Sequence, residues 1–213
     1  LPLCNPLAEW IREGDTGGLQ TEDTMEKKIT SPISPDVVES LKAGDQVSIS
    51  GVIYVGRDAA HKRLVETLDK GEKLPFDIKG QTIYYMGPSP TKPGHVIGSA
   101  GPTTSGRMDA YTPRLLAAGL KAMIGKGLRT DKVKEAIKEH KAVYLAATGG
   151  AAALIAKAIT KSEIIAYEEL GPEALLRLEV KDFPAVVIND SKGGDLYQEG
   201  KAKYRIQVGA AKK

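Results

Sequence analysis

Short β-branched segments alternate with helix-forming segments along most of this chain, and this order constrains the fold more than any other feature. Residues 47–55 are typical of a strand, because β-branched side chains alternate there with polar ones. Residues 58–68 follow as a helix that places His61, Leu64 and Leu68 on one face. The pattern continues with strands expected at residues 82–86, 121–124, 142–147, 164–167, 176–180 and 185–188, and helices at residues 112–119, 130–140 and 149–158. The alternation predicts an α/β fold.

Length and charge limit the class of protein. The chain has 213 residues, which suits one domain with a core of its own. Its 30 basic and 27 acidic residues leave a net charge of only +3, and 5% of the residues are aromatic, which argues against a dedicated nucleic-acid binder. No apolar run approaches the roughly 20 residues of a membrane span, and the N-terminus lacks the features of a secretory signal. We expect a cytoplasmic protein without a nucleic-acid or membrane partner.

The segment 101–109, Gly-Pro-Thr-Thr-Ser-Gly-Arg-Met-Asp, is the strongest indication of a binding site. Its glycines and proline predict an exposed loop that presents the hydroxyls of residues 103–105. Ser, Thr and Asp are also the usual helix-capping residues, so capping alone would explain an isolated Thr-Thr pair. Arg107 favours a site, because its planar fork suits a carboxylate or phosphate. With Lys126 at a later strand end, the residues alone predict an anion site.

Several motifs occur together in the order that one enzyme family has. They are the segments 51–61 (Gly-x-Ile-x-x-x-Arg-Asp-x-x-His), 74–77, 83–88, 101–109, 125–127 (Gly-Lys-Gly), 149–152, 167–171 and 180–184. On these motifs the chain resembles class I (iron-sulfur) fumarate hydratases, in their beta subunit or C-terminal domain. The resemblance implies a single compact swivelling β/β/α domain at residues 25–213. Residues 1–24, with five acidic residues against one basic, are then an extension of uncertain origin.

The resemblance also implies a reaction and a cofactor. Such enzymes hydrate fumarate reversibly to (S)-malate, a step of the tricarboxylic acid cycle, and hold a [4Fe-4S] cluster on cysteines of the alpha subunit or N-terminal half. This chain has one cysteine, Cys4, which cannot supply the three or four thiolates of a cluster. The resemblance therefore implies a beta subunit that binds no metal itself, is inactive without a cysteine-bearing alpha subunit, and assembles as a heterotetramer or a self-associating dimer.

The same resemblance implies roles for individual residues. Arg57 and Arg107 would bind the carboxylates of a small dicarboxylate substrate, with Thr104 as a further contact. Thr103 would be the catalytic base, in a dry cationic pocket that stabilises its alkoxide, with Thr104 as the alternative base. Lys126 would contact the substrate or tune Thr103.

Three neighbouring residues have supporting or open roles. His61 is either a helix residue at the margin of the core or a catalytic group for proton transfer. Asp58 is expected to cap the helix that it begins. Asp58 and Asp109 are also expected to orient Arg57 and Arg107 rather than to contact a dianion.

Other functions stay open. Beta subunits of L-tartrate dehydratases and mesaconate-hydrating relatives have similar motifs, although the glycines before Arg57 and Arg107 favour fumarate. A non-catalytic dicarboxylate-binding module would also lack cluster ligands, and a phosphate-binding domain is a third possibility. The glycine pair at residues 149–150 lacks the spacing of a dinucleotide site or a P-loop and predicts close packing instead.

Overall fold

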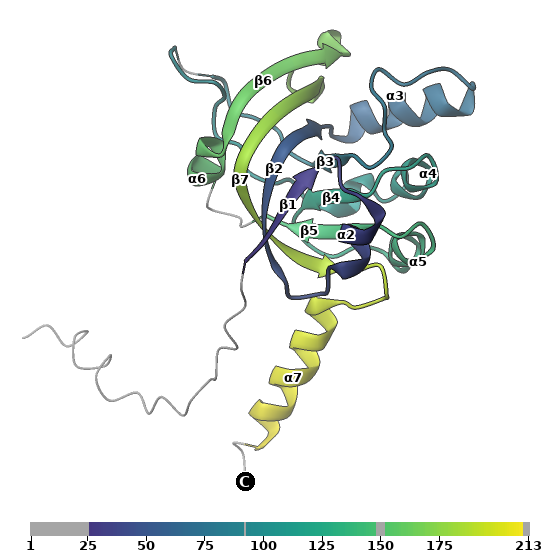
Figure 1. The fold of residues 1–213 in the computed structure, drawn as a ribbon, viewed down its shortest axis with the longest axis vertical. Helices are drawn as coiled ribbons and strands as arrows, with labels where there is room; N and C mark the ends of the chain where they lie inside the picture. Colours follow the sequence, from purple (N-terminus) through teal and green to yellow (C-terminus); the bar gives the residue numbers. More distant parts are fainter. Residues whose placement is uncertain (1–25, 92, 148–151, 211–213) are drawn as a thin grey trace, which may run out of the picture.

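A computed structural model describes residues 26–91, 93–147 and 152–210 (Figure 1). Within these residues seven strands form one sheet, in the order β1-β2-β3-β4-β5-β7-β6. The strands are β1 (Lys27–Ser31), β2 (Gln46–Val55), β3 (Thr82–Tyr84), β4 (Ala122–Gly125), β5 (Val143–Ala146), β6 (Ile159–Ala166) and β7 (Leu175–Asn189). The helices are α2 (Pro35–Ser40), α3 (Asp58–Asp69), α4 (Thr112–Ala117), α5 (Asp131–Glu139), α6 (Ala152–Lys157) and α7 (Leu196–Ala210), with short 3-10 helices η1 (Ser105–Met108) and η2 (Glu168–Glu173). The combination confirms the α/β prediction.

The sheet curls until β2 and β7 pair with each other. Neighbours from β1 to β5 run parallel, whereas the 15-residue β7 runs antiparallel to β5, β6 and β2. The circuit β2-β3-β4-β5-β7 is therefore closed, and β1 and β6 extend it at the two ends. Figure 1 shows the resulting curvature, with β6 and β7 arching over the shorter parallel strands. The fold is one domain built on a barrel-like sheet.

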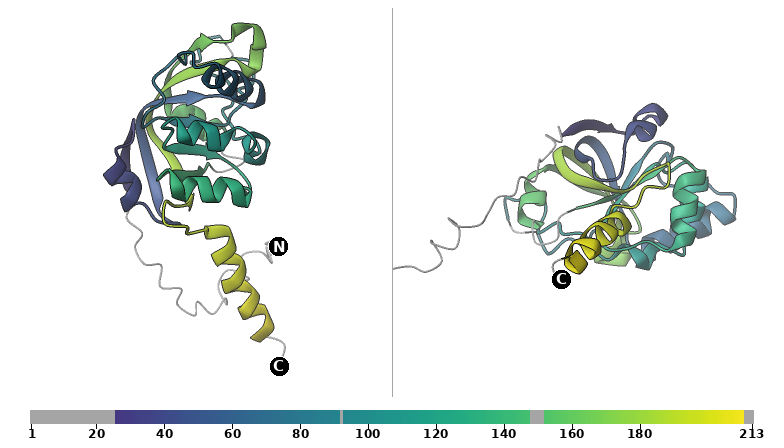
Figure 2. Two further views of the ribbon diagram at one scale, coloured as in Figure 1. Left: turned by 90° about the vertical axis from the view of Figure 1, so that its right-hand side faces the viewer. Right: turned by 90° about the horizontal axis from the view of Figure 1, so that it is seen from below.

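Two apolar cores lie on the two faces of the curled sheet. Strand residues alternate between them, so that Ala122 and Ile124 of β4 join one core and Met123 joins the other. The core enclosed by the curl contains Tyr84 and Phe183, whose rings meet edge to face at 5.2 Å. The other core lies under α3, α4 and α5, which stack along one side of the sheet in Figures 1 and 2. The short strands β3, β4 and β5 are buried on both faces, in agreement with their short, nearly continuous apolar sequences.

The strand predictions agree with β2 to β5 to within two residues at each end and are wrong near the C-terminus. The strands expected at residues 176–180 and 185–188 are parts of the single strand β7, because both pair with β2 across a local irregularity at Ile49 and Gly51. The strand expected at residues 164–167 begins earlier, as β6 at Ile159. After the buried Ile159, residues 160–163 are polar and exposed or half-buried, so hydrophobic periodicity could not reveal this part of the strand.

Two further helices, α6 and α7, follow strands β5 and β7 in the chain. The predicted helix at residues 149–158 corresponds to α6, while the glycine pair at residues 149–150 lies outside the described residues. Helix α7 follows β7 and extends away from the sheet (Figure 2). Within the ranges that the structure describes, no helix is both long and apolar enough to cross a membrane.

Candidate active site

Three parallel strands deliver the predicted site residues to one edge of the sheet. Strand β2 is followed by Arg57, β3 by the loop that reaches Thr103, and β4 by Lys126. Because neighbouring parallel strands end at the same edge, these segments meet there. The Thr103 N–H donates to the Tyr85 carbonyl at 2.7 Å, and Thr104 forms a parallel bridge with Lys126. Their position at strand ends matches the prediction.

Ser105 joins the loop after β3 to the loop after β4. Its N–H donates to the Lys126 carbonyl at 2.9 Å, and its Oγ accepts the Lys126 N–H at 3.0 Å. The Tyr144 hydroxyl lies 2.9 Å from the same Oγ and itself donates to the Gly127 carbonyl at 3.0 Å, so the Ser105 hydroxyl donates to Tyr144. The expectation that Ser105 is exposed is wrong, since it is fully buried and fastens two loops together.

Arg57 is held by a glutamate from a distant part of the chain. Its Nη2 lies 3.3 Å from Oε1 of Glu173, at the end of η2, and about a quarter or less of each side chain is exposed. The Nε atom of Arg57 is buried and has no hydrogen-bond partner. The expectation that Asp58 orients Arg57 is wrong, because the carboxylate of Asp58 pairs with Arg107 instead.

Arg107 pairs with Asp58, the residue that directly follows Arg57 in the sequence. Nη2 of Arg107 donates to Oδ2 of Asp58, and 51% of the Arg107 side chain is exposed. Asp58 is the first residue of α3, and its side chain does not cap the helix as predicted. Asp109, which was expected to orient Arg107, accepts a hydrogen bond from Nε of Arg129 at 2.7 Å. That expectation is also wrong.

Arg129 is a buried cation beneath the site, and sequence reasoning missed it. Its side chain is fully buried, with Nε bonded to Asp109 and Nη2 donating to the Thr112 hydroxyl at 2.8 Å. Its guanidinium carbon lies 5.4 and 4.9 Å from the ring centres of Tyr85 and Tyr144. The positive charge is thus paired and covered by aromatic rings, as a buried charge requires. No local pattern around residue 129 separates it from a surface arginine.

His61 lies under Arg57 and is completely buried. Its Nδ1 is 2.9 Å from the Arg57 carbonyl oxygen, its Nε2 has no partner, and its ring packs edge to face on Tyr85 at 5.1 Å. Burial is the main reason that the pKa of His61 is lowered to about 4; the hydrogen bond to the Arg57 carbonyl opposes this shift and the charge of Arg129 adds to it. The imidazole is therefore neutral at neutral pH, with the Nδ1 proton assigned from the carbonyl that it faces.

The remaining predicted side chains face the surface. Thr104, Arg107 and Lys126 are exposed, and Thr103 is partly buried. Among the residues that the structure describes, no group of three or more His, Cys, Asp or Glu side chains is arranged to hold a metal ion, and Cys4 lies outside them. This edge of the sheet can therefore offer hydroxyls and positive charge to an anion, and it provides no ligand set for a cluster.

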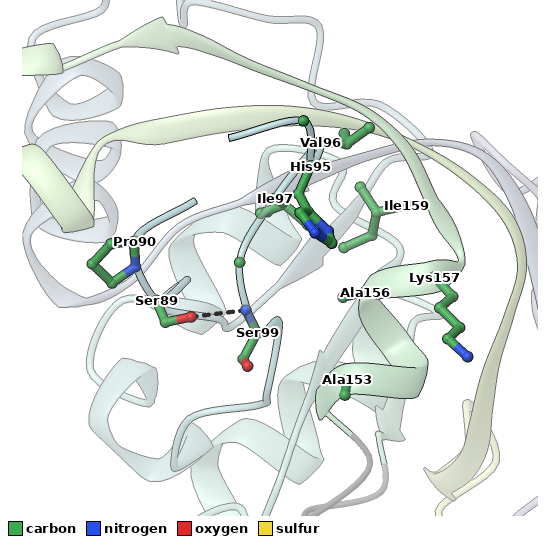
Figure 3. A pocket seen from close by; sticks show the side chains of 12 residues that line it. Ser89, Pro90, His95, Val96, Ile97, Ser99, Ala153, Ala156, Lys157 and Ile159 are labelled. Carbon is green, nitrogen blue, oxygen red and sulfur yellow. Dashed lines mark hydrogen bonds between the residues drawn. The ribbon is translucent and has the colours of Figure 1, made fainter. Parts of the chain in front are cut away.

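A cavity of about 570 Å³ lies beside this edge, between residues 89–90 and 94–99 on one side and helix α6 on the other (Figure 3). His95 and Ile159 project into it, and the Ser99 N–H donates to Oγ of Ser89 at 2.8 Å on its wall. None of the predicted site residues lines this cavity. It borders the site through the same loop, since the Ala100 N–H donates to the Ala152 carbonyl at 3.3 Å.

Comparisons with known proteins agree with the arrangement. A model of the fumarase C-terminus family matches residues 6–200. The aerobic class I fumarate hydratase of Escherichia coli (strain K12) is 47% identical over 156 residues, which are 72% of this chain and 28% of that protein. Fumarate hydratase 2 of Leishmania major is 42% identical over 158 residues, 73% of this chain and 28% of that protein.

A shorter relative covers nearly the same extent as this chain. A protein of Methanocaldococcus jannaschii provisionally named L(+)-tartrate dehydratase subunit beta is 40% identical over 168 residues, 76% of this chain and 86% of that protein. The chain thus spans 28% of the length of the two fumarate hydratases and most of the length of the subunit. With this coverage and identity, the chain belongs to the fumarase C-terminus family.

Proposed function

We propose that this chain is the beta part of a hydro-lyase that adds water reversibly to fumarate and forms (S)-malate. The observation that carries the proposal is the meeting of Arg57, Arg107, Lys126 and two threonines at the ends of β2, β3 and β4. Two guanidinium groups suit a substrate with two carboxylates, because each can bind one in a bidentate manner. The names of the relatives support this choice of reaction.

The reaction sets two tasks for these residues. Water adds its oxygen to one carbon of the double bond and a proton to the other, and both carboxylates keep their charge. Arg57 and Arg107, with Thr104, would hold the dianion, and Thr103 would deliver or remove the proton at carbon. A threonine alkoxide needs nearby positive charge, which Lys126 and the arginines would supply.

We assign to His61 the supporting one of the two roles that the sequence left open. A catalytic group must reach the reacting atoms, whereas the His61 ring is enclosed between Arg57 and Tyr85. Through its Nδ1 proton it would hold the Arg57 carbonyl and so fix the start of α3. Direct proton transfer by His61 is the alternative, and it would require the enclosing residues to move.

The described residues do not fit a [4Fe-4S] cluster, because they contain no cysteine and no other ligand group. We propose that a cysteine-bearing alpha subunit holds the cluster and completes the site over the exposed Thr104, Arg107 and Lys126. A heterotetramer or a self-associating dimer in the cytoplasm is the corresponding assembly. L-Tartrate or a mesaconate-type substrate is the second candidate, which the tartrate dehydratase relative favours.

Anaerobic hydration of fumarate, followed by the loss of its ultraviolet absorbance, tests the proposal. The chain alone, a cysteine-rich alpha partner alone, and the two combined after cluster reconstitution are compared. Activity only in the mixture supports the proposal, and L-tartrate and mesaconate are then assayed in the same mixture. Absence of activity with all three substrates, with the cluster of the partner verified, would favour a non-catalytic dicarboxylate-binding module.

A further inference from the structure

The carboxylate of Glu173 has two separate partners, both at the start of α3. Its Oε1 lies 3.3 Å from Nη2 of Arg57, and its Oε2 accepts the Ala59 N–H at 3.0 Å. The first amide groups of a helix have no acceptor within the helix, so Ala59 needs an acceptor from elsewhere. Arg57 occupies the N-cap position and its side chain makes no capping bond. A residue more than a hundred positions away thus provides the cap.

The opposite side of the Arg57 fork is confined by a glycine. A Cβ at Gly87 would lie 2.6 Å from Nη1 of Arg57 and 3.3 Å from its Cδ and Cζ. The guanidinium therefore lies close to the Gly87 backbone, where a side chain on residue 87 would displace it. With Glu173 on the other side, Arg57 has little freedom, although 22% of its side chain is exposed.

Although the Arg57 guanidinium is held on two sides, some of its N–H donors have no partner within the chain's described residues. Glu173 is the partner of Nη2, while Nε of Arg57 is buried and unpartnered. A buried donor without a partner is costly unless a ligand satisfies it. The Arg57 donors that Glu173 does not occupy therefore have a fixed direction, and a ligand acceptor that bonds to them would remove the cost of an unsatisfied buried donor.

We propose that Glu173 is a positioning residue, which sets the direction of the Arg57 guanidinium for carboxylate binding while it caps α3. The link to a dicarboxylate substrate rests on the proposed function. The positioning of Arg57 by Glu173 does not.

The variant Glu173→Gln separates the two roles. Glutamine keeps an oxygen that can accept the Ala59 N–H, but it removes the negative charge that attracts Arg57. Glu173→Ala removes both interactions. Glu169→Gln is the matched control, because Glu169 lies on the same η2 helix and pairs with the exposed Arg63 instead. Gly87→Ala disturbs Arg57 from the other side without touching Glu173.

The first measurement is the Nε–H signal of Arg57 in the nitrogen-15 NMR spectrum of the full chain alone, assigned by its loss in Arg57→Lys. We expect a protected, slowly exchanging signal in the wild type and in Glu169→Gln. In Glu173→Gln the signal should exchange at least about tenfold faster while unfolding by urea stays close to wild type. An unchanged signal in Glu173→Gln overturns the proposal.

The second measurement uses the complex with the alpha partner. Misdirection of a carboxylate-binding group should raise KM about tenfold in Glu173→Gln and change kcat less, because Arg57 binds the substrate in the ground state and in the transition state alike. The effects of Glu173→Gln and Gly87→Ala should be less than additive, since both act through Arg57. A wild-type KM in Glu173→Gln overturns the link to substrate binding. The two proposals can fail separately. If the Arg57 Nε–H exchanges faster in Glu173→Gln but the wild-type complex does not hydrate fumarate, the positioning role is supported and the proposed substrate is refuted.

Discussion

Ser105 and Lys126 exchange two hydrogen bonds, with the Ser105 N–H donating to the Lys126 carbonyl at 2.9 Å and the Lys126 N–H donating to Oγ of Ser105 at 3.0 Å. The pair joins the loop that carries Thr103 to the strand end that carries Lys126. These hydrogen bonds therefore fix the position of Lys126, proposed to stabilise charge, relative to Thr103, proposed to transfer the proton. Their geometry depends on a serine that is itself buried.

Replacement of Ser105 by alanine should destabilise the chain. The Lys126 N–H and the Tyr144 hydroxyl each lose a partner, which costs about 1–3 kcal/mol for a buried group. Urea unfolding measures the change, with Ser99→Ala as the exposed control, for which we expect a change within about 0.5 kcal/mol. Equal stability of Ser105→Ala and the wild type would contradict the fastening role.

Arg107→Lys should keep the fold and lose most turnover in the complex. The ion pair with Asp58 is half exposed, and such pairs contribute about 0–1 kcal/mol, so unfolding should change little. A lysine replaces the planar fork with a point charge, so bidentate carboxylate binding is lost. The control is Arg114→Lys, which changes another exposed arginine, paired with Asp69 away from the site, and should leave turnover intact. Wild-type rates in Arg107→Lys would remove Arg107 from the site.

Thr103→Val should abolish the exchange of the malate C3 proton with solvent while leaving substrate binding largely intact. Valine is nearly isosteric with threonine, and the backbone bond from residue 103 to the Tyr85 carbonyl does not depend on the side chain. Deuterium incorporation into malate by the complex measures the exchange. Thr104→Val is the matched variant, since residue 104 is adjacent but more exposed. Normal exchange in Thr103→Val would transfer the role to Thr104 or Lys126.

The sequence predicted the strand ends that carry the site because those strands are buried on both faces. Short, largely apolar segments such as 142–147 have few alternatives to a central strand, and a parallel sheet places the ends of such strands together. The order of the motifs then indicated which residues at these strand ends are candidates for the site, including Arg57 and Arg107. These predictions use sequence patterns and the order of motifs, and none of them needs to know which distant side chains meet.

The pairing of the acidic residues could not be predicted, because it depends on how the sheet closes. Asp58 is adjacent to Arg57 in sequence, yet the direction of α3 takes its carboxylate to Arg107. Glu173 reaches Arg57 because β6 and β7 arch over the ends of the parallel strands. The polar residues 160–163 of β6 gave no hydrophobic periodicity from which that arch could be predicted. Long-range pairing of charges therefore required the structure.

Stability should fall with acid through His61, because burial lowers its pKa to about 4 in the folded chain. In the unfolded chain its pKa is about 6.5, so below that pH the unfolded state takes up a proton that the folded state refuses. The His61 contribution is thus complete above about pH 6.5 and is lost as the pH falls towards 4. Between about pH 7.5 and about pH 5 the loss should be roughly 2 kcal/mol.

Urea unfolding at both pH values tests this dependence in the wild type, His61→Gln and His95→Gln. In His61→Gln the group that binds the extra proton is gone, so its loss of stability on acidification should be smaller by that amount, whatever its stability at neutral pH. His95→Gln is the control, and its acid dependence should match that of the wild type, since the His95 side chain is exposed and lies apart from His61. Identical acid dependence in wild type and His61→Gln would mean that His61 is protonated or accessible in the folded chain, which would restore the direct proton-transfer role.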